Sequence, residues 1–145
     1  IFALAKDREN CTEPYKLLVR LNVFGDDGAR ALVDLLADAD RFNTGDPIFR
    51  NHWQHAYLAA VIGLCQMGPR AASVLPDVLK LVNSGAVILS GGASHGQRGA
   101  TMLIRLGQPA DTILGLAAAH EEYPMSANDL DDAVRRATSP EGCAF

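Results

Sequence analysis

The sequence predicts an all-α protein, an α-solenoid of about three helical hairpins with a terminal capping helix. Three glycines, at positions 25, 68 and 107, each separate two amphipathic segments, and the intervals between them are 43 and 39 residues. A repeat near forty residues with two helices per unit is typical of an α-solenoid, in which each hairpin buries its apolar stripes against its neighbours. Leucines recur in register, four residues before and seven residues after each glycine (Leu21, Leu64, Leu103; Leu32, Leu75, Leu114).

The first unit is expected at residues 12–38. Thr12 offers a hydroxyl to cap a helix, and Pro14 suits the first helical turn because its missing N–H has no partner there. Gly25 ends this helix. Asp26 follows where the second helix begins, a position at which the positive end of the helix dipole favours a carboxylate.

The second unit, residues 50–83, carries the clearest pattern. Its first helix, expected at about 51–67, is apolar nearly all round after Tyr57, as a helix covered on both sides by neighbouring units should be. Its second helix contains Pro76. Since a proline in a helix removes one backbone hydrogen bond, we expect a bend early in that helix.

The third unit is expected at residues 94–120, and a last helix at 126–138. Small residues dominate the second helix of the third unit, which permits close helix approach. In the last helix Ser126 is a candidate N-cap, with Asp129 three residues later in a capping-box arrangement. This helix would cap the stack, or would be the first half of a further repeat that is cut off at Phe145.

Two connections between the units, residues 39–50 and 84–94, are longer than the two to eight residues usual between packed helices. Both lead from a second helix to the next first helix, so we expect them at the same end of the solenoid. Residues 86–89 within the later connection are apolar. They either fold back onto the solenoid or pair as a short strand.

Two segments, residues 67–82 and 106–116, resemble the HEAT repeat family. They read MGPRAASVLPDVLKLV and LGQPADTILGL. The resemblance extends over roughly residues 14–120, is strongest in the middle unit and fades toward both ends. It implies a solenoid of HEAT-like hairpins, and it is nearly silent about function, because HEAT units serve many unrelated scaffolds.

Charge and composition exclude some classes of partner. The 145 residues carry a formal net charge of −4 and no block of lysines or arginines, which counts against a nucleic-acid surface. No uninterrupted run approaches the ~18 apolar residues of a membrane span, so no membrane partner is predicted. The chain does not begin with methionine, and we expect it to be either processed or a fragment of a longer protein.

The three cysteines, Cys11, Cys65 and Cys143, are an odd number without close spacing. Cys65 falls in an apolar helix, where a free cysteine behaves as a small hydrophobic residue. A reduced, cytoplasmic protein is therefore predicted.

No catalytic residue, metal site or cofactor is predicted. His52 and His55 lie three residues apart and share a helix face, but a zinc site needs three or four ligands. Asp46 and His95 are the only further candidates, and no spacing supports them. The glycine-rich residues 91–96 lack the ending of a phosphate-binding loop, and no nucleophile with a base stands out.

Two surfaces are candidate binding sites. The first is a helix face formed by the second helices, whose residues five, nine and twelve positions after each glycine should align in rows: Arg30, Asp34, Ser73, Asp77, Lys80 and Thr112. Within it Arg30 and Asp34 could form a local i,i+4 ion pair. The second is a connection edge with Phe49 and Ile88 as apolar anchors, a possible place of self-association.

The predicted function is a non-catalytic protein-interaction scaffold, or a module of one. Two alternatives stay open. A small-ligand or chromophore-lyase-like HEAT protein would require a pocket lined by His52, Trp53, Tyr57 and His95. An enzyme of the HEAT-like DNA glycosylase kind is the other, and the acidic balance counts against it.

Overall fold

The computed structural model describes residues 12–91 and 94–143, and within them every regular element is a helix. The all-α prediction is confirmed. The α-helices are α2 (Thr12–Val19), α3 (Gly25–Ala39), α4 (Pro47–Met67), α5 (Leu75–Asn83), α6 (Ser94–Leu106), α7 (Ile113–His120) and α8 (Ala127–Arg136). Short 3-10 helices stand beside them: η1 (Arg20–Val23), η2 (Asp40–Phe42), η3 (Gly68–Val74), η4 (Ala110–Thr112) and η5 (Pro140–Cys143).

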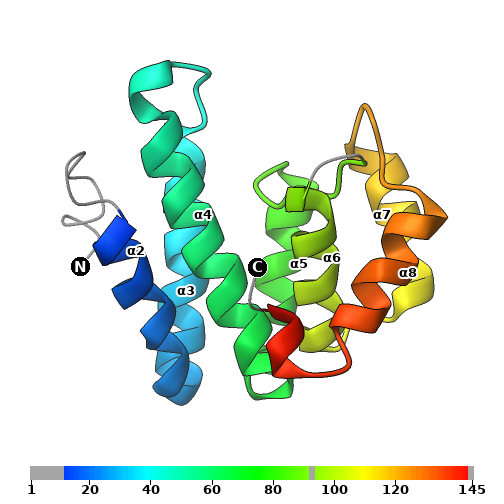
Figure 1. The fold of residues 1–145 in the computed structure, drawn as a ribbon, viewed down its shortest axis with the longest axis horizontal. Coiled ribbons are helices and arrows are strands. Elements are labelled where there is room, and N and C mark those ends of the chain that lie inside the picture. The colour runs from blue at the N-terminus through cyan, green and yellow to red at the C-terminus, as the bar shows by residue number, and fades with distance from the viewer. Residues whose placement is uncertain (1–11, 92–93, 144–145) are drawn as a thin grey trace.

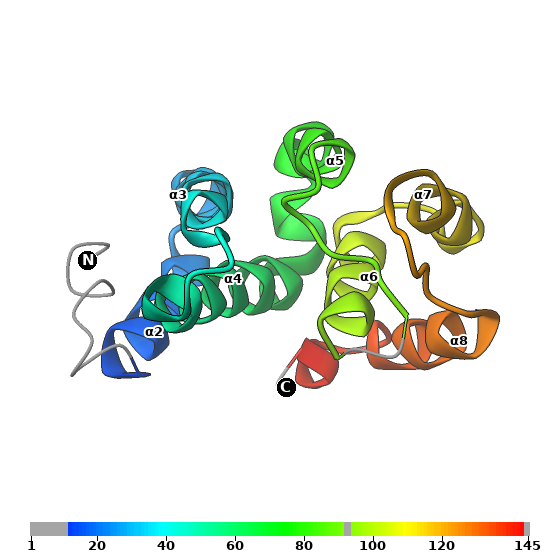
Figure 2. The same ribbon diagram turned by 90° about the horizontal axis from the view of Figure 1, so that it is seen from above.

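The helices form two layers. Helices α2, α4, α6 and α8 lie side by side in one layer, and α3, α5 and α7 lie in the other (Figures 1 and 2). Each helix of the first layer runs antiparallel to the helix of the second layer that follows it in sequence. The chain therefore makes three adjacent hairpins, with α8 extending the first layer.

All three corner glycines adopt a backbone conformation that favours glycine. Their φ angles are 61° at Gly25, 55° at Gly68 and 115° at Gly107. A side chain at such an angle would strain the backbone, because Cβ crowds the neighbouring peptide groups. The glycine spacing in the sequence thus marks the three points where the chain reverses between layers.

The leucine column seven residues after each corner is only partly in the core. Leu32 is fully buried, whereas Leu75 and Leu114 are half-buried, and the residue before each of them is buried instead, Val74 at the end of η3 and Ile113 at the start of α7. The cause lies in how each second helix starts. Helix α3 begins at its corner glycine, whereas η3 or η4 precedes α5 and α7. A 3-10 helix turns about 120° per residue against about 100° for an α-helix, so it rotates the face that follows.

The helix ends follow the capping residues. Asp46 precedes α4 and its side chain accepts the backbone N–H of Ile48 at 2.9 Å. Ser126 and Asp129 form a reciprocal capping box at α8. Pro76 occupies the first turn of α5, where its missing N–H leaves no bond broken, so the expected bend inside a longer helix is instead a helix start.

Helix α4 is the centre of the core. It packs against α2, α3 and α6, and residues 59–61 and 64–65 are fully buried. This explains its apolar composition on nearly every side. The sequence has no unbroken apolar run long enough for a membrane span, so no span was predicted. The helical run Pro47–Asn83 is nevertheless long and apolar enough to span a membrane by length and composition. Because 61% of its most apolar window is buried, a core helix accounts for the same composition.

The later connection folds back onto the helices. We call residues 84–91 the strap; in it Ala86, Val87 and Leu89 are buried. The backbone N–H of Leu89 donates to Glu121 Oε1 at 2.8 Å, and the carbonyl of Leu89 accepts the N–H of Met125 at 3.1 Å. Of the two expectations for residues 86–89, folding back is correct; the nearest feature to a strand in the described residues is the bridge between Ser90 and Pro124.

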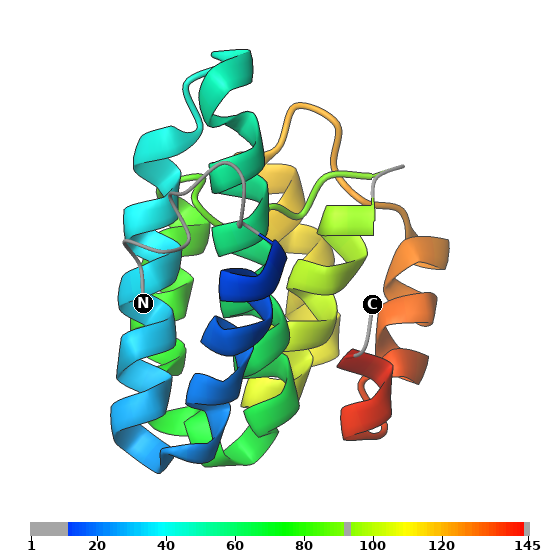
Figure 3. The same ribbon diagram turned by 60° about the vertical axis from the view of Figure 1, so that its left-hand side comes forward.

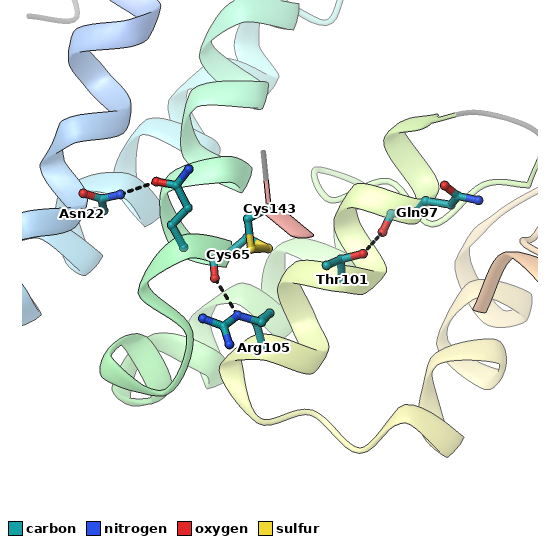
Figure 4. Close-up of a disulfide and its surroundings, with 7 residues drawn as sticks. Asn22, Cys65, Gln97, Thr101, Arg105 and Cys143 are labelled. Carbon is teal, nitrogen blue, oxygen red and sulfur yellow. Dashed lines mark hydrogen bonds between the residues drawn. A yellow bond between two sulfur atoms is a disulfide. The ribbon is translucent and has the colours of Figure 1, made fainter. Parts of the chain in front are cut away.

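Cys65 and Cys143 form a disulfide, which joins the last turns of α4 to η5 near the C-terminal end of the chain (Figure 4). Both cysteines are fully buried. The expectation of a free Cys65 is therefore wrong, because folding brings together two residues that are 78 positions apart in sequence. The predicted cytoplasmic location was based partly on a free Cys65, so it no longer has that support. It stays a prediction. Cys11 lies outside the described residues.

Candidate interaction surfaces

The predicted helix face contains an ion-pair network that joins two hairpins. Arg30 on α3 reaches across to α5, where its Nη2 lies 2.6 Å from Asp77 Oδ2. Lys80 Nζ lies 3.7 Å from the other oxygen of Asp77. Beside them, Ser73 donates its hydroxyl to Asp26 Oδ1 at 3.3 Å. Residues predicted on this face are therefore in contact between the two units, but Arg30 at position five meets Asp77 at position nine, so the contact does not follow one of the expected rows.

Arg30 pairs with the neighbouring unit and not with Asp34 in its own helix. Asp34 is exposed one turn along α3, and its charge only adds to the favourable potential at the guanidinium. The local i,i+4 pair is thus replaced by a contact between helices that lie side by side. Sequence spacing within one helix cannot show this, because the position of the partner depends on how the two hairpins pack.

The network shifts both of its main groups toward their charged forms. The hydrogen bond from Arg30 is the largest cause that holds the pKa of Asp77 below its ordinary value, and the charges of Arg30 and Lys80 act in the same direction. The same hydrogen bond raises the pKa of Arg30. Because these side chains are exposed to water, screening by salt limits what the pairs contribute to stability.

Thr112, the candidate from the third unit, takes part in a local turn. Its hydroxyl donates to the carbonyl of Pro109 at 2.6 Å and accepts from Gln108 Nε2 at 2.7 Å. These bonds fix the start of α7. Among the candidates from the sequence, Arg30, Ser73, Asp77 and Lys80 are therefore gathered around the α3–α5 contact, whereas Thr112 serves its own unit.

The predicted connection edge divides into an exposed part and a buried part. Phe49 is 38% exposed on the first turn of α4, which projects beyond the neighbouring helices (Figures 1 and 3). Ile88 is half-buried in the strap, and its backbone N–H donates to the Tyr57 hydroxyl at 3.0 Å. The strap buries its apolar side chains, so Phe49 and Ile88 do not form one exposed apolar surface.

Three aromatic rings pack together between α4 and the start of α6. The ring centroids of Trp53 and Tyr57 are 5.6 Å apart, and His95 lies edge-on to both at 5.9 and 5.7 Å. Tyr57 is fully buried, and this burial raises the pKa of its hydroxyl. We call Trp53, Tyr57 and His95 the aromatic cluster. It contains three of the four residues of the pocket expected for a small-ligand protein.

The fourth residue, His52, lies apart from the cluster, with its ring 6.4 Å from that of Phe42. The cluster itself is packed. A cavity of about 190 Å³ adjoins it instead, lined by Phe42, Asn43, Gly45, Asp46, Arg50, Trp53 and Gln54. The sequence alone did not single out Arg50 and Gln54. Their spacing could have indicated them, because Trp53 and Gln54 follow Arg50 by three and four residues and therefore share its face of α4.

The surroundings of His95 favour the neutral form of its ring. Its Nδ1 atom is buried and has no hydrogen-bond partner among the described residues. Burial is the main cause that lowers the pKa of His95, and the nearby charge of Arg98 lowers it further. For His55, burial and the neighbouring His52 likewise lower the pKa. In the part of the chain that the structure describes, no three metal-ligating side chains gather at one place.

A second cavity, of about 360 Å³, lies between α6 and α8. It is lined by Gln97, Asp132, Arg135 and Arg136. Asp132 forms an ion pair with Arg135 and accepts a hydrogen bond from Gln97 Nε2 at 3.3 Å. Its polar groups are thus largely engaged with one another.

Comparison with known proteins adds no information on the family or function of this chain. The chain matches no protein-family model, no curated protein and no solved structure. The resemblance to HEAT repeats therefore rests on residues 67–82 and 106–116, and it enters below as part of a proposal.

Proposed function

We propose that this chain is a non-catalytic protein-interaction scaffold made of HEAT-like hairpins, and that its partner binds the α3–α5 face. The observation that carries the proposal is the charge arrangement on this face. Arg30, Asp77 and Lys80 bridge two hairpins, and Asp34 stands exposed beside them. Charges held in fixed positions on a rigid pair of helices form a surface that can select a partner of complementary charge.

The expected contact is modest and sensitive to salt. The face carries charges of both signs, and its charged side chains are open to water. Exposed charges steer association and fix orientation more than they add affinity, and their effect falls as ionic strength rises. A protein segment with basic and acidic residues in alternation would fit such a face.

A charge-reversal experiment tests this assignment. The double variant Asp34→Lys and Asp77→Lys should lose partner capture at low salt, because it reverses the charge at both acidic candidate positions of the face. The matched control is Glu122→Lys with Asp131→Lys, which changes the net charge equally at exposed positions away from α3 and α5. Captured proteins are compared by cross-linking and mass spectrometry at two salt concentrations.

The two variants distinguish a specific face from a general charge effect. Loss of the same cross-linked partner in the first variant and its retention in the control supports the proposal. Equal capture by both variants would remove the α3–α5 face from consideration. A melting temperature within a degree or two of the original chain shows that each variant is folded.

A further inference from the structure

The cavity of about 190 Å³ beside the aromatic cluster is built from three consecutive pieces of chain. Phe42 comes from η2, residues 43–46 form the connecting loop, and the remaining lining residues stand on the first two turns of α4. The loop is held by the cap that Asp46 makes to Ile48 and by the N–H that Asp46 donates to Thr44 Oγ1 at 3.3 Å. The cavity is thus fixed by local bonds on the projecting end of α4.

Two aromatic rings line this cavity, and each packs against another ring. The Trp53 ring packs on Tyr57 and His95 in the aromatic cluster. The Phe42 ring lies 5.8 Å from that of Phe49. Rings that are held in place offer flat apolar faces at low entropic cost, which suits a planar ligand.

One cation at the cavity is available to a ligand. Arg50 lines it, and no ion pair or hydrogen bond within the described residues engages its guanidinium. The nearest opposite charge that also lines the cavity, Asp46, caps α4, where the positive end of the helix dipole offsets it. A guanidinium binds a carboxylate through two parallel hydrogen bonds, and the amides of Asn43 and Gln54 can add further donors.

We infer that this cavity binds a small aromatic carboxylate, with its single ring between Phe42 and Trp53 and its carboxylate on Arg50. The volume limits the ligand to about one ring, since cavities that hold drug-sized molecules are typically about 300 to 1,000 Å³. This site is separate from the α3–α5 face, so neither assignment depends on the other.

Nuclear magnetic resonance offers a direct test, because Trp53 is the only tryptophan and gives a single indole N–H signal. Benzoate added to the ¹⁵N-labelled protein should shift this signal in a saturable manner, with a Kd on the order of 1 mM for so small a ligand. Benzamide has the same shape without the charge. It should bind at least about fivefold more weakly, because it cannot form charge-assisted bonds with Arg50.

The variants Arg50→Gln and Phe42→Ala assign the two halves of the site. Arg50→Gln should weaken benzoate binding by about tenfold, the loss of one charged contact. Arg70→Gln is the matched control: Arg70 is equally exposed, on η3, outside the lining of the cavity. The remaining signals of each spectrum show whether the variant is folded.

Three results would overturn the inference. The first is the absence of a saturable shift of the Trp53 signal up to about 20 mM benzoate, well above the affinity expected of a single ring. The second is equal binding by Arg50→Gln and Arg70→Gln. The third is binding that survives in a folded Phe42→Ala variant without loss, since the ligand ring would then make no contact with Phe42 in the original chain.

Discussion

At the scale of single residues, the described structure joins groups that sequence spacing keeps apart. Arg30 and Asp77 are 47 positions apart, and their contact ties the first hairpin to the second. Position five after one corner glycine meets position nine after the next. The sequence predicted that both residues lie on one face. It could not predict their pairing, because the offset between neighbouring hairpins depends on side-chain packing in three dimensions.

His95 makes stability depend on pH. Its pKa in the folded protein lies below the ordinary histidine value of about 6.5, mainly because of burial. The unfolded chain therefore binds the proton more readily, and the free energy of unfolding should fall as pH drops below that value. Above it the ring is neutral in both states, so this dependence disappears.

The variant His95→Phe isolates this effect. It keeps a ring against Trp53 and Tyr57 but removes the proton and the buried Nδ1 atom. We expect urea unfolding between pH 7.5 and 5 to show a shallower loss of stability in the variant than in the original chain. His55 also makes the free energy of unfolding depend on pH, and it does so in both proteins. The difference between the two curves therefore measures the contribution of His95. Parallel curves would show that His95 has the same pKa in the folded and the unfolded chain.

At the scale of elements, α3 and α4 pack closely where Leu32 meets Gly63. A Cβ atom added at Gly63 would lie 2.8 Å from Leu32 Cδ1, so the leucine fills the space that the glycine leaves. Leu32→Ala should lower the free energy of unfolding by about 2–5 kcal/mol, as removal of a fully buried leucine does. Leu75→Ala, at the equivalent but half-buried position, should cost less.

Gly63→Ala tests whether these two residues act as a pair. Alone it forces Leu32 to move; combined with Leu32→Ala it fills part of the cavity. The double variant should therefore be more stable than the sum of the two single effects predicts, in urea unfolding. Simple additivity would mean that the helices separate or shift when either residue changes.

The elements were predictable to different degrees for physical reasons. Corner glycines, helix caps and apolar stripes act locally, and these features indicated the helices and their reversals. No local sequence pattern indicated the 3-10 helix η3. This helix rotates the buried face of α5, so that Leu75 lies closer to the surface. For the strap, the sequence could not decide between folding back and pairing as a strand. Its backbone bonds go to Glu121 and Met125, which come from later in the chain.

At the scale of the whole molecule, the disulfide between Cys65 and Cys143 should set overall stability. It closes a loop of 78 residues, and loops of this length restrict the unfolded chain enough to add about 4 kcal/mol to the free energy of unfolding. Cys143→Ala should lose roughly that amount, and a reducing agent should have the same effect on the original chain. Urea unfolding with and without reductant measures both.

Two comparisons complete this test. Cys11→Ala serves as the control, since Cys65 and Cys143 pair with each other. The reduced protein should keep its helical circular dichroism spectrum, because the helices also pack on α4 through apolar core contacts that do not depend on the disulfide bond. Equal stability with and without reductant would show that the two sulfurs are not bonded in solution.

The same bond divides the chain mechanically. When force is applied to the two ends of this chain, the disulfide transmits it directly between Cys65 and Cys143. Helices α5, α6, α7 and α8 therefore bear no load. Only α2, α3 and α4 lie on the loaded path and can unravel. Once the bond is reduced, the shielded 78 residues come under load and release a hidden length on the order of 270 Å. Under such a load the chain would therefore have two extended lengths, and the redox state of the disulfide would decide between them.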